Sequence, residues 1–214
     1  MGGDKDTYTF PFDTCEKPRE SGIAQPYSVV VNIVSCFIVL YFLVHTKTNH
    51  AFLLLLALLV FESFHTLSHL THIKGTFSYT ATHMSGFLFN VAFLNFLYRY
   101  TKVIPRPYYF GIFCGILACD LYAFFHLSFI FAVLTQIILF ITILGYYYPL
   151  LNKDIKANLN IILGFFFVIY LAFVNEKMNC KRMLKSFPDF PFHMIIEALG
   201  ILPIYILCTT VYGL

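Results

Sequence analysis

The segment Glu62-Ser-Phe-His65-Thr-Leu-Ser68-His69-Leu-Thr-His72, followed after ten further residues by His83, decides the interpretation of this sequence. An α-helix turns ~100° per residue, so the carboxylate, hydroxyl and imidazole side chains of the segment fall within an arc of about 120°. The ten residues before it are almost wholly aliphatic. Such a polar stripe is predicted to face the interior of a helix bundle. Because ionisable groups at membrane depth are costly, we interpret the stripe as a functional site.

The composition predicts an integral membrane protein. Of 214 residues, 59% are hydrophobic and 12% are charged, which exceeds what a water-soluble domain of this length needs. The 26 Phe and 15 Tyr residues suit lipid-facing helices with Tyr at the membrane interfaces. A net charge of +3 without a dense basic cluster gives no reason to expect nucleic acid as a partner. Residues 1–26 lack the basic-then-apolar order of a cleavable signal peptide, and we interpret them as a retained polar tail.

Seven apolar segments predict an all-α polytopic membrane protein, with seven transmembrane helices in residues 27–214 and an intramembrane polar metal site. Most of the segments approach the ~20 residues that a bilayer requires. They are Tyr27–Val44, Ala51–Leu70, Tyr79–Tyr98, Tyr108–Leu121, His126–Tyr148, Ala157–Val174 and Phe192–Tyr212. The 42 residues of 108–149 would make one helix about 63 Å long, two bilayer thicknesses. We therefore expect a tight turn near residues 121–126.

The alternating direction of seven spans gathers scattered polar residues on one side of the membrane, here called side A. Helix two ends on the side where helix one begins, and helices three and seven begin there. This places His72, His83, Asp120, His126 and His193 near side A, with the tail. We interpret the Asp and the His of the four–five hairpin as surface groups. The side A segments hold 8 Lys and Arg and the opposite segments hold 6, so charge does not set the orientation.

Two of the six cysteines lie in polar segments that the alternating direction of the helices places on side A, namely Cys15 and Cys180. A bridge between them would tie the tail to the six–seven loop and would make side A the oxidising, lumenal or exterior side. The alternative is a pair of unpaired thiols. The other four lie in or beside apolar spans and are interpreted as small core residues.

The polar stripe predicts zinc chemistry. His65, His69 and His72 recur at i, i+4 and i+7, and an imidazole from helix seven, His193, would complete a zinc site beside the hydroxyl of Ser68. The alternative interpretation is a hydrogen-bonded polar seam between helices.

A carboxylate near His193 would supply a further ligand, and two are within one turn. Glu197 lies one turn deeper in the apolar helix, where an unpaired carboxylate needs a cationic partner. Asp189 lies between Pro188 and Pro191, where a regular helix has not yet begun. The sequence therefore favours Glu197.

These residues resemble those of the alkaline ceramidases and their wider seven-helix hydrolase superfamily, which includes the progestin and adipoQ receptors. The short motifs that carry the resemblance are Asp13-Thr-Cys15-Glu16, Asn32-x-x-Ser35, Ser68-x-x-x-His72, Cys180 and His193. The resemblance implies that Asp13 and Glu16 bind calcium and that the two cysteines form a disulfide. It also implies that Ser68 is the active-site serine and that His72 and His193 bind zinc.

Three positions depart from the family pattern. His83 stands where the family carries an Asp, and a single His plus a carboxylate replaces the helix-seven pair of histidines. Val29 stands where helix one carries a calcium-binding Glu. A zinc site of histidines and a carboxylate remains chemically sound.

The expected function is zinc-dependent hydrolysis of an amide or ester bond in a membrane lipid, the class that includes ceramide. His72, His193 and Glu197 are the expected ligands, with His69 as a further candidate. Ser68 would stabilise the oxyanion and His83 would manage the proton. We expect location in the endoplasmic reticulum, Golgi or plasma membrane, with the N-terminus lumenal or exterior.

Two other functions fit the same polar cluster. A di-iron lipid hydroxylase or desaturase would also use about eight histidines, and this chain has 8, but it lacks their His-His doublets. A non-catalytic receptor or a proton-conducting protein would likewise place ionisable groups inside the membrane. Metal identity separates the first from a zinc hydrolase, and turnover of a labelled ceramide separates the second.

Overall fold

The computed structural model describes residues 15–16, 19, 22–70, 76–126, 129–188 and 190–214. Within these residues the chain forms α-helices and one short 3-10 turn, and no β-strand. The helices are α1 (Pro26–His45), α2 (Asn49–Leu70), α3 (Thr76–Thr101), α4 (Pro107–His126), α5 (Phe129–Tyr147), α6 (Lys153–Ser186) and α7 (Phe192–Tyr212). Each of the seven predicted apolar segments corresponds to one of these helices.

Five of these helices are long and apolar enough to cross a membrane, which indicates an integral membrane protein. They are α1, α2, α4, residues 153–176 of α6, and α7. Residues 134–150, in α5 and the turn after it, form a shorter apolar helix. Large apolar side chains such as Phe37 and Val44, each 66% exposed, cover the outer faces of the bundle. Surface of this kind is unfavourable in water and suits contact with lipid.

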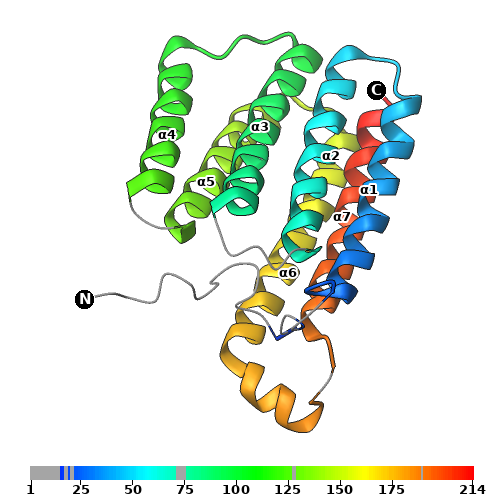
Figure 1. Cartoon of the computed structure of the whole chain (residues 1–214). Coiled ribbons are helices and arrows are strands. Elements are labelled where there is room, and N and C mark those ends of the chain that lie inside the picture. The colour runs from blue at the N-terminus through cyan, green and yellow to red at the C-terminus, as the bar shows by residue number, and fades with distance from the viewer. Residues whose placement is uncertain (1–14, 17–18, 20–21, 71–75, 127–128, 189) are drawn as a thin grey trace.

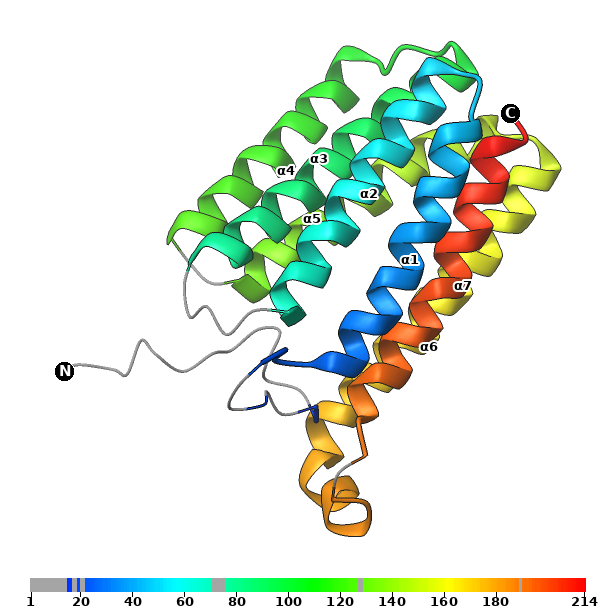
Figure 2. The same ribbon diagram turned by 45° about the vertical axis from the view of Figure 1, so that its right-hand side comes forward.

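The helices pack in the spatial order α6, α7, α1, α2, α3, α5 and α4, with each helix against the next (Figures 1 and 2). The last helix therefore lies beside the first. The beginnings of α1, α3 and α7 lie at the same end of the molecule as the ends of α2 and α4, drawn at the bottom of Figure 1. This is the end to which alternating direction assigns the polar residues.

The buried side chains of α2 change from apolar to polar along the helix. Leu54 and Leu55 in the first turns of α2 are fully buried and pack with Phe93 and Ile143. The last turns of α2 instead bury His69 and other polar side chains. Between membrane helices, close packing of such side chains stabilises the bundle through van der Waals contacts. The buried ionisable side chains of α2 lie in the other half of the helix.

Two predicted boundaries are wrong. α4 continues through His126, so the turn does not lie at residues 121–126. Residues 116–144 contain no Gly or Pro that would mark a break. Cys180 lies in α6 rather than in a loop, because the helix continues past the apolar span to Ser186. Residues 176–185 are mostly good helix formers, and hydropathy marks the end of a span, not the end of a helix.

Candidate metal centre

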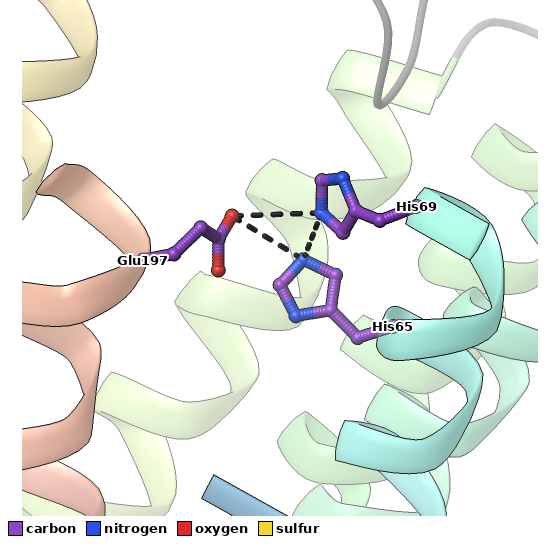
Figure 3. Close-up of side chains that lie close together, drawn as sticks. All are labelled: His65, His69 and Glu197. Atoms are coloured by element: carbon purple, nitrogen blue, oxygen red, sulfur yellow. Dashed lines mark hydrogen bonds and ion pairs between the residues drawn. The ribbon is translucent and has the colours of Figure 1, made fainter. Parts of the chain in front are cut away.

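Three side chains from two helices converge on one point inside the bundle (Figure 3). Nε2 of His65 lies 3.7 Å, and Nε2 of His69 lies 3.6 Å, from Oε1 of Glu197. The two ring nitrogens are 3.2 Å apart. The ligand atoms of all three residues lie within 4.8 Å of one another. These residues can therefore act together as ligands of one metal ion.

Helical periodicity positions these groups. His65 and His69 are one turn apart on α2, and His193 and Glu197 are one turn apart on α7, so each pair projects from one face of its helix. Nε2 of His193 lies 2.9 Å from Oε1 of Glu197. A third imidazole thus borders the group. We call these four residues the metal-centre cluster.

The spacing of the donor atoms fits zinc. Bonds of ~2.0–2.1 Å place neighbouring ligand atoms of a tetrahedral zinc site about 3.4 Å apart. The distances among His65, His69 and Glu197 are 3.2, 3.6 and 3.7 Å. Two histidines and one glutamate are also a known ligand set of catalytic zinc sites, which keep a fourth position open.

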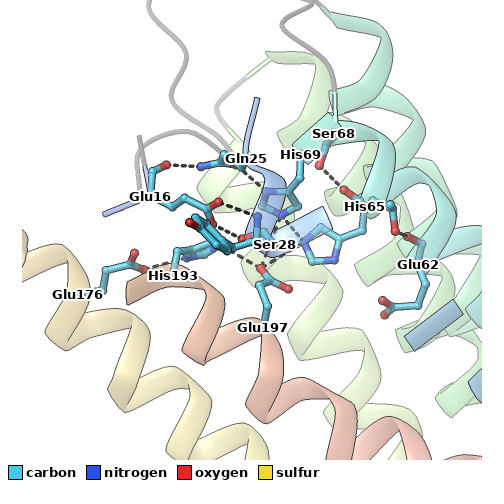
Figure 4. Close-up of polar contacts among 12 residues, drawn as sticks. Glu16, Gln25, Ser28, Glu62, His65, Ser68, His69, Glu176, His193 and Glu197 are labelled. Atoms are coloured by element: carbon cyan, nitrogen blue, oxygen red, sulfur yellow. Dashed lines mark hydrogen bonds and ion pairs between the residues drawn. The ribbon is translucent and has the colours of Figure 1, made fainter. Parts of the chain in front are cut away.

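An outer hydrogen bond fixes the ring of His69 (Figure 4). Nε2 of Gln25 donates to the backbone carbonyl of Glu16, so the amide oxygen of Gln25 is the atom that faces the ring. That oxygen lies 2.6 Å from Nδ1 of His69. Nδ1 therefore donates, and the lone pair of Nε2 points toward Glu197. Outer partners of this kind orient metal-binding histidines in proteins.

Glu176 plays the corresponding part for His193. Its Oε2 lies 3.0 Å from Nδ1 of His193, and its Oε1 accepts a hydrogen bond of 2.7 Å from the backbone N–H of Cys15. The glutamate is 2% exposed. α6, α7 and the polar tail are thereby joined at one carboxylate.

The charge balance of the cluster also favours a cation. Glu62, Glu176 and Glu197 all lie around the imidazoles (Figure 4), and Glu62 is 5% exposed. Among the described residues, the ion pairs of Glu176 and Glu197 are with histidines, and no Lys or Arg pairs with any of the three carboxylates. Buried carboxylates need nearby positive charge. A divalent metal ion would supply it.

The tail is attached next to the cluster. Cys15 and Cys180 lie at disulfide distance, with Cα atoms 5.5 Å apart, as parity predicted. The carboxylate of Glu16 accepts hydrogen bonds from Ser28 Oγ (2.6 Å) and the Tyr27 backbone N–H (3.2 Å) at the start of α1. Its expected calcium partner, Asp13, lies outside the described residues. Calcium binding stays a prediction.

Several expected site residues are placed elsewhere or not described. His72 and Asp189 lie outside the described residues, so their roles as ligands stay predictions. Ser68 is 3% exposed, and its hydroxyl donates to the backbone carbonyl of His65 at 2.6 Å rather than to a ligand side chain of the cluster. Its role at an oxyanion stays a prediction as well.

His83 belongs to a second buried group, which we call the His83 cluster. Its Nε2 lies 3.2 Å from Oδ2 of Asp120, and Thr135 donates to Oδ1 of the same carboxylate at 2.7 Å. Gln136 donates to the His83 backbone carbonyl, and Phe124 stacks on the ring at 4.4 Å. The expectation that Asp120 is a surface group is wrong, because it is fully buried. Proton transfer by His83 at the zinc site stays a prediction.

Sequence reasoning did not find Glu176 or Gln25. A signal existed for Glu176, because it is an acidic residue at the end of the sixth apolar segment, on the side where parity collects polar groups. Nothing marks Gln25 in the sequence. Its position follows from backbone pairing, in which its N–H donates to the carbonyl of His69 at 3.0 Å.

No family model, curated protein or solved structure matches this chain. The geometry of the metal-centre cluster therefore carries the functional argument.

Proposed function

We propose that this protein is a zinc-dependent hydrolase of a membrane lipid and cleaves the amide bond of a ceramide-like substrate. His65, His69 and Glu197 would hold the metal, with His193 beside it. The observation that carries the proposal is the convergence of these donor atoms within 4.8 Å at zinc-like spacings inside a bundle of apolar helices.

The surrounding residues prepare the site for such chemistry. A bound zinc ion supplies Lewis acidity, which polarises a carbonyl group and makes water nucleophilic near neutral pH. Gln25 and Glu176 each hold one ring nitrogen of an imidazole, so the rings of His69 and His193 are fixed before a substrate arrives. Fixed donors cost little reorganisation during reaction. The buried setting also strengthens every electrostatic contact at the site.

The depth of the cluster supports a lipid amide as the substrate. Glu197 is the sixth residue of α7 and His69 is the second-last residue of α2. At 1.5 Å per residue, Glu197 lies about 8 Å inside its helix. An amide that links a headgroup to an acyl chain would reach this depth from the bilayer.

We also propose the finer topology and location. α3 and α5 would complete seven spans, and the end of the bundle that carries the tail would face the lumen or the exterior. The Cys15–Cys180 pair supports that orientation, because disulfides persist in oxidising compartments. The endoplasmic reticulum, the Golgi and the plasma membrane provide such a side.

The test uses the purified full chain in detergent, with zinc measured by elemental analysis and turnover measured with a fluorescent ceramide. The unmodified protein is expected to hold about one zinc and to release the labelled fatty acid, whereas His69→Ala should lose both. His126→Ala, at the exposed end of α4, is the matched control and should keep both. Zinc without turnover would contradict the hydrolase, and two irons per chain would indicate an oxidative enzyme instead.

A further inference from the structure

A second site lies beside the metal centre, in a pocket of about 520 Å³. Its walls come from three parts of the chain: the polar tail, the start of α1 and the connection from α6 to α7. Among the residues that line it are Glu16, Arg19, Tyr27, Leu184 and Phe190. We propose that this pocket binds the phosphate-bearing headgroup of a membrane lipid, with Arg19 as the anchor.

The position of the pocket fits a lipid headgroup. α1 and α7 begin at the pocket, and the apolar span of α6 has already ended before Leu184. The pocket therefore lies where the helices leave the membrane. Tyr27 and Phe190 are 46% and 42% exposed there, as is typical of aromatic side chains at the membrane–water interface.

The charge of the pocket fits a phosphate. The exposed guanidinium of Arg19 lies 6.0 Å from the ring centroid of Tyr27 and forms no ion pair with any other described residue. The carboxylate of Glu16 already accepts bonds from Ser28 and from the Tyr27 backbone, which face it from α1. Guanidinium groups bind phosphate through paired hydrogen bonds.

The surroundings of the pocket add positive charge. The end of α6 projects beyond the other helices (Figure 2) and carries exposed Lys181, Arg182 and Lys185 on the turns that flank Leu184. Basic groups next to a membrane span attract anionic headgroups. These basic side chains favour an anion next to the end of α6.

The pocket also adjoins the outer partners of the metal centre. Cys15, another lining residue, donates to Glu176, which holds His193. The backbone carbonyl of Glu16 accepts from Gln25, which holds His69. A bound headgroup would thus lie two side chains away from the imidazoles. The proposal itself concerns binding and does not depend on hydrolysis.

The experiment is native mass spectrometry of the full chain in neutral detergent with phosphatidic acid. Diacylglycerol with the same acyl chains serves as the lipid without phosphate. Phosphatidic acid should bind at least about tenfold more tightly than diacylglycerol, which is the effect expected of one charged hydrogen-bonded contact. Equal binding of the two lipids would overturn the proposal whatever the variants do.

Two variants and one competitor complete the test. Arg19→Ala should remove the tenfold preference and Arg19→Lys should keep part of it, because a lysine makes a point contact only. Arg182→Ala removes a charge from the same end outside this pocket, and should change binding by no more than about twofold since exposed charges are screened. An unchanged preference in Arg19→Ala would overturn the proposal. Displacement of the lipid by millimolar inorganic phosphate would show a site for the free ion and would overturn the lipid assignment.

Discussion

The metal-centre cluster and the His83 cluster are both buried, yet they differ in how their charges are matched. In the His83 cluster one imidazole faces one carboxylate, and the second oxygen of Asp120 accepts from Thr135. In the metal-centre cluster the imidazoles of His65, His69 and His193 all approach a single oxygen of Glu197. The first arrangement satisfies its own groups. The second gathers three imidazole nitrogens around one carboxylate oxygen, an arrangement in which a cation can bind several of these atoms at once.

The two clusters also differ in their outer support. Gln25 and Glu176 orient the imidazoles of the metal-centre cluster from outside and are themselves held by the tail. In the His83 cluster, Nε2 of Gln136 donates to the His83 backbone carbonyl and lies 3.3 Å from both nitrogens of the ring, so one amide joins α5 to α3. Outer partners orient metal-binding histidines where several ligands converge. The His83 cluster offers one imidazole and one carboxylate, so we interpret it as a structural tie between helices.

The largest expected effect comes from the Cys15–Cys180 pair, which adjoins the metal-centre cluster and not the His83 cluster. Cys15→Ser opens a link between residues separated by 165 positions, and the chain-entropy estimate for such a loop is about 5 kcal/mol. We expect a lower unfolding temperature and weaker zinc binding, because Cys15 also holds Glu176. Cys114 is a free exposed thiol in α4, so Cys114→Ser should change neither quantity. Thermal unfolding with zinc titration measures both, and equal behaviour of the two variants would contradict the prediction.

The next effect tests whether the His83 cluster is structural. His83→Ala leaves the carboxylate of Asp120 buried without its partner, which is expected to cost about 3–5 kcal/mol of stability. Zinc content should stay at the level of the unmodified protein. The double variant with Asp120→Asn should recover much of the lost stability, since it removes the unpaired charge. Loss of zinc from a folded His83→Ala protein would place His83 in the metal site and remove the distinction between the clusters.

A smaller effect tests the outer support. Gln25→Ala removes the acceptor that orients His69 and should weaken zinc binding about 10–100-fold. Gln136→Ala removes a similar amide from the His83 cluster and should leave zinc affinity unchanged. Competition with a chromophoric zinc chelator measures both constants. Equal affinities would show that Gln25 does not orient a ligand.

The sequence predicts the helices well because apolar runs mark membrane-length segments. It also predicts the stripe of Glu62, His65 and His69, since helical periodicity alone places them on one face. The sequence does not predict side-chain contacts that depend on how the helices pack. The pairing of His83 with Asp120 requires knowing that α3 and α4 meet through their side chains near α5.

The choice of ligands shows the same limit. The sequence favoured His72, His193 and Glu197, with His69 as a further candidate. The donor atoms within 4.8 Å in the described structure are those of His65, His69 and Glu197, and His72 lies outside the described residues. The i, i+4 and i+7 spacing allows more than one pair of these histidines to face α7. The register depends on the rotation of α2 about its axis, and tertiary packing fixes that rotation.

The central claim is that His65, His69 and Glu197 bind one zinc ion, and X-ray absorption at the zinc edge tests it most directly. The full chain should show two imidazoles and carboxylate or water oxygen at about 2.0–2.2 Å, without sulfur. His65→Ala should lose one imidazole from this shell, and His83→Ala should leave the spectrum unchanged. A zinc shell that contains sulfur, or one that keeps both imidazoles in His65→Ala, would contradict the account.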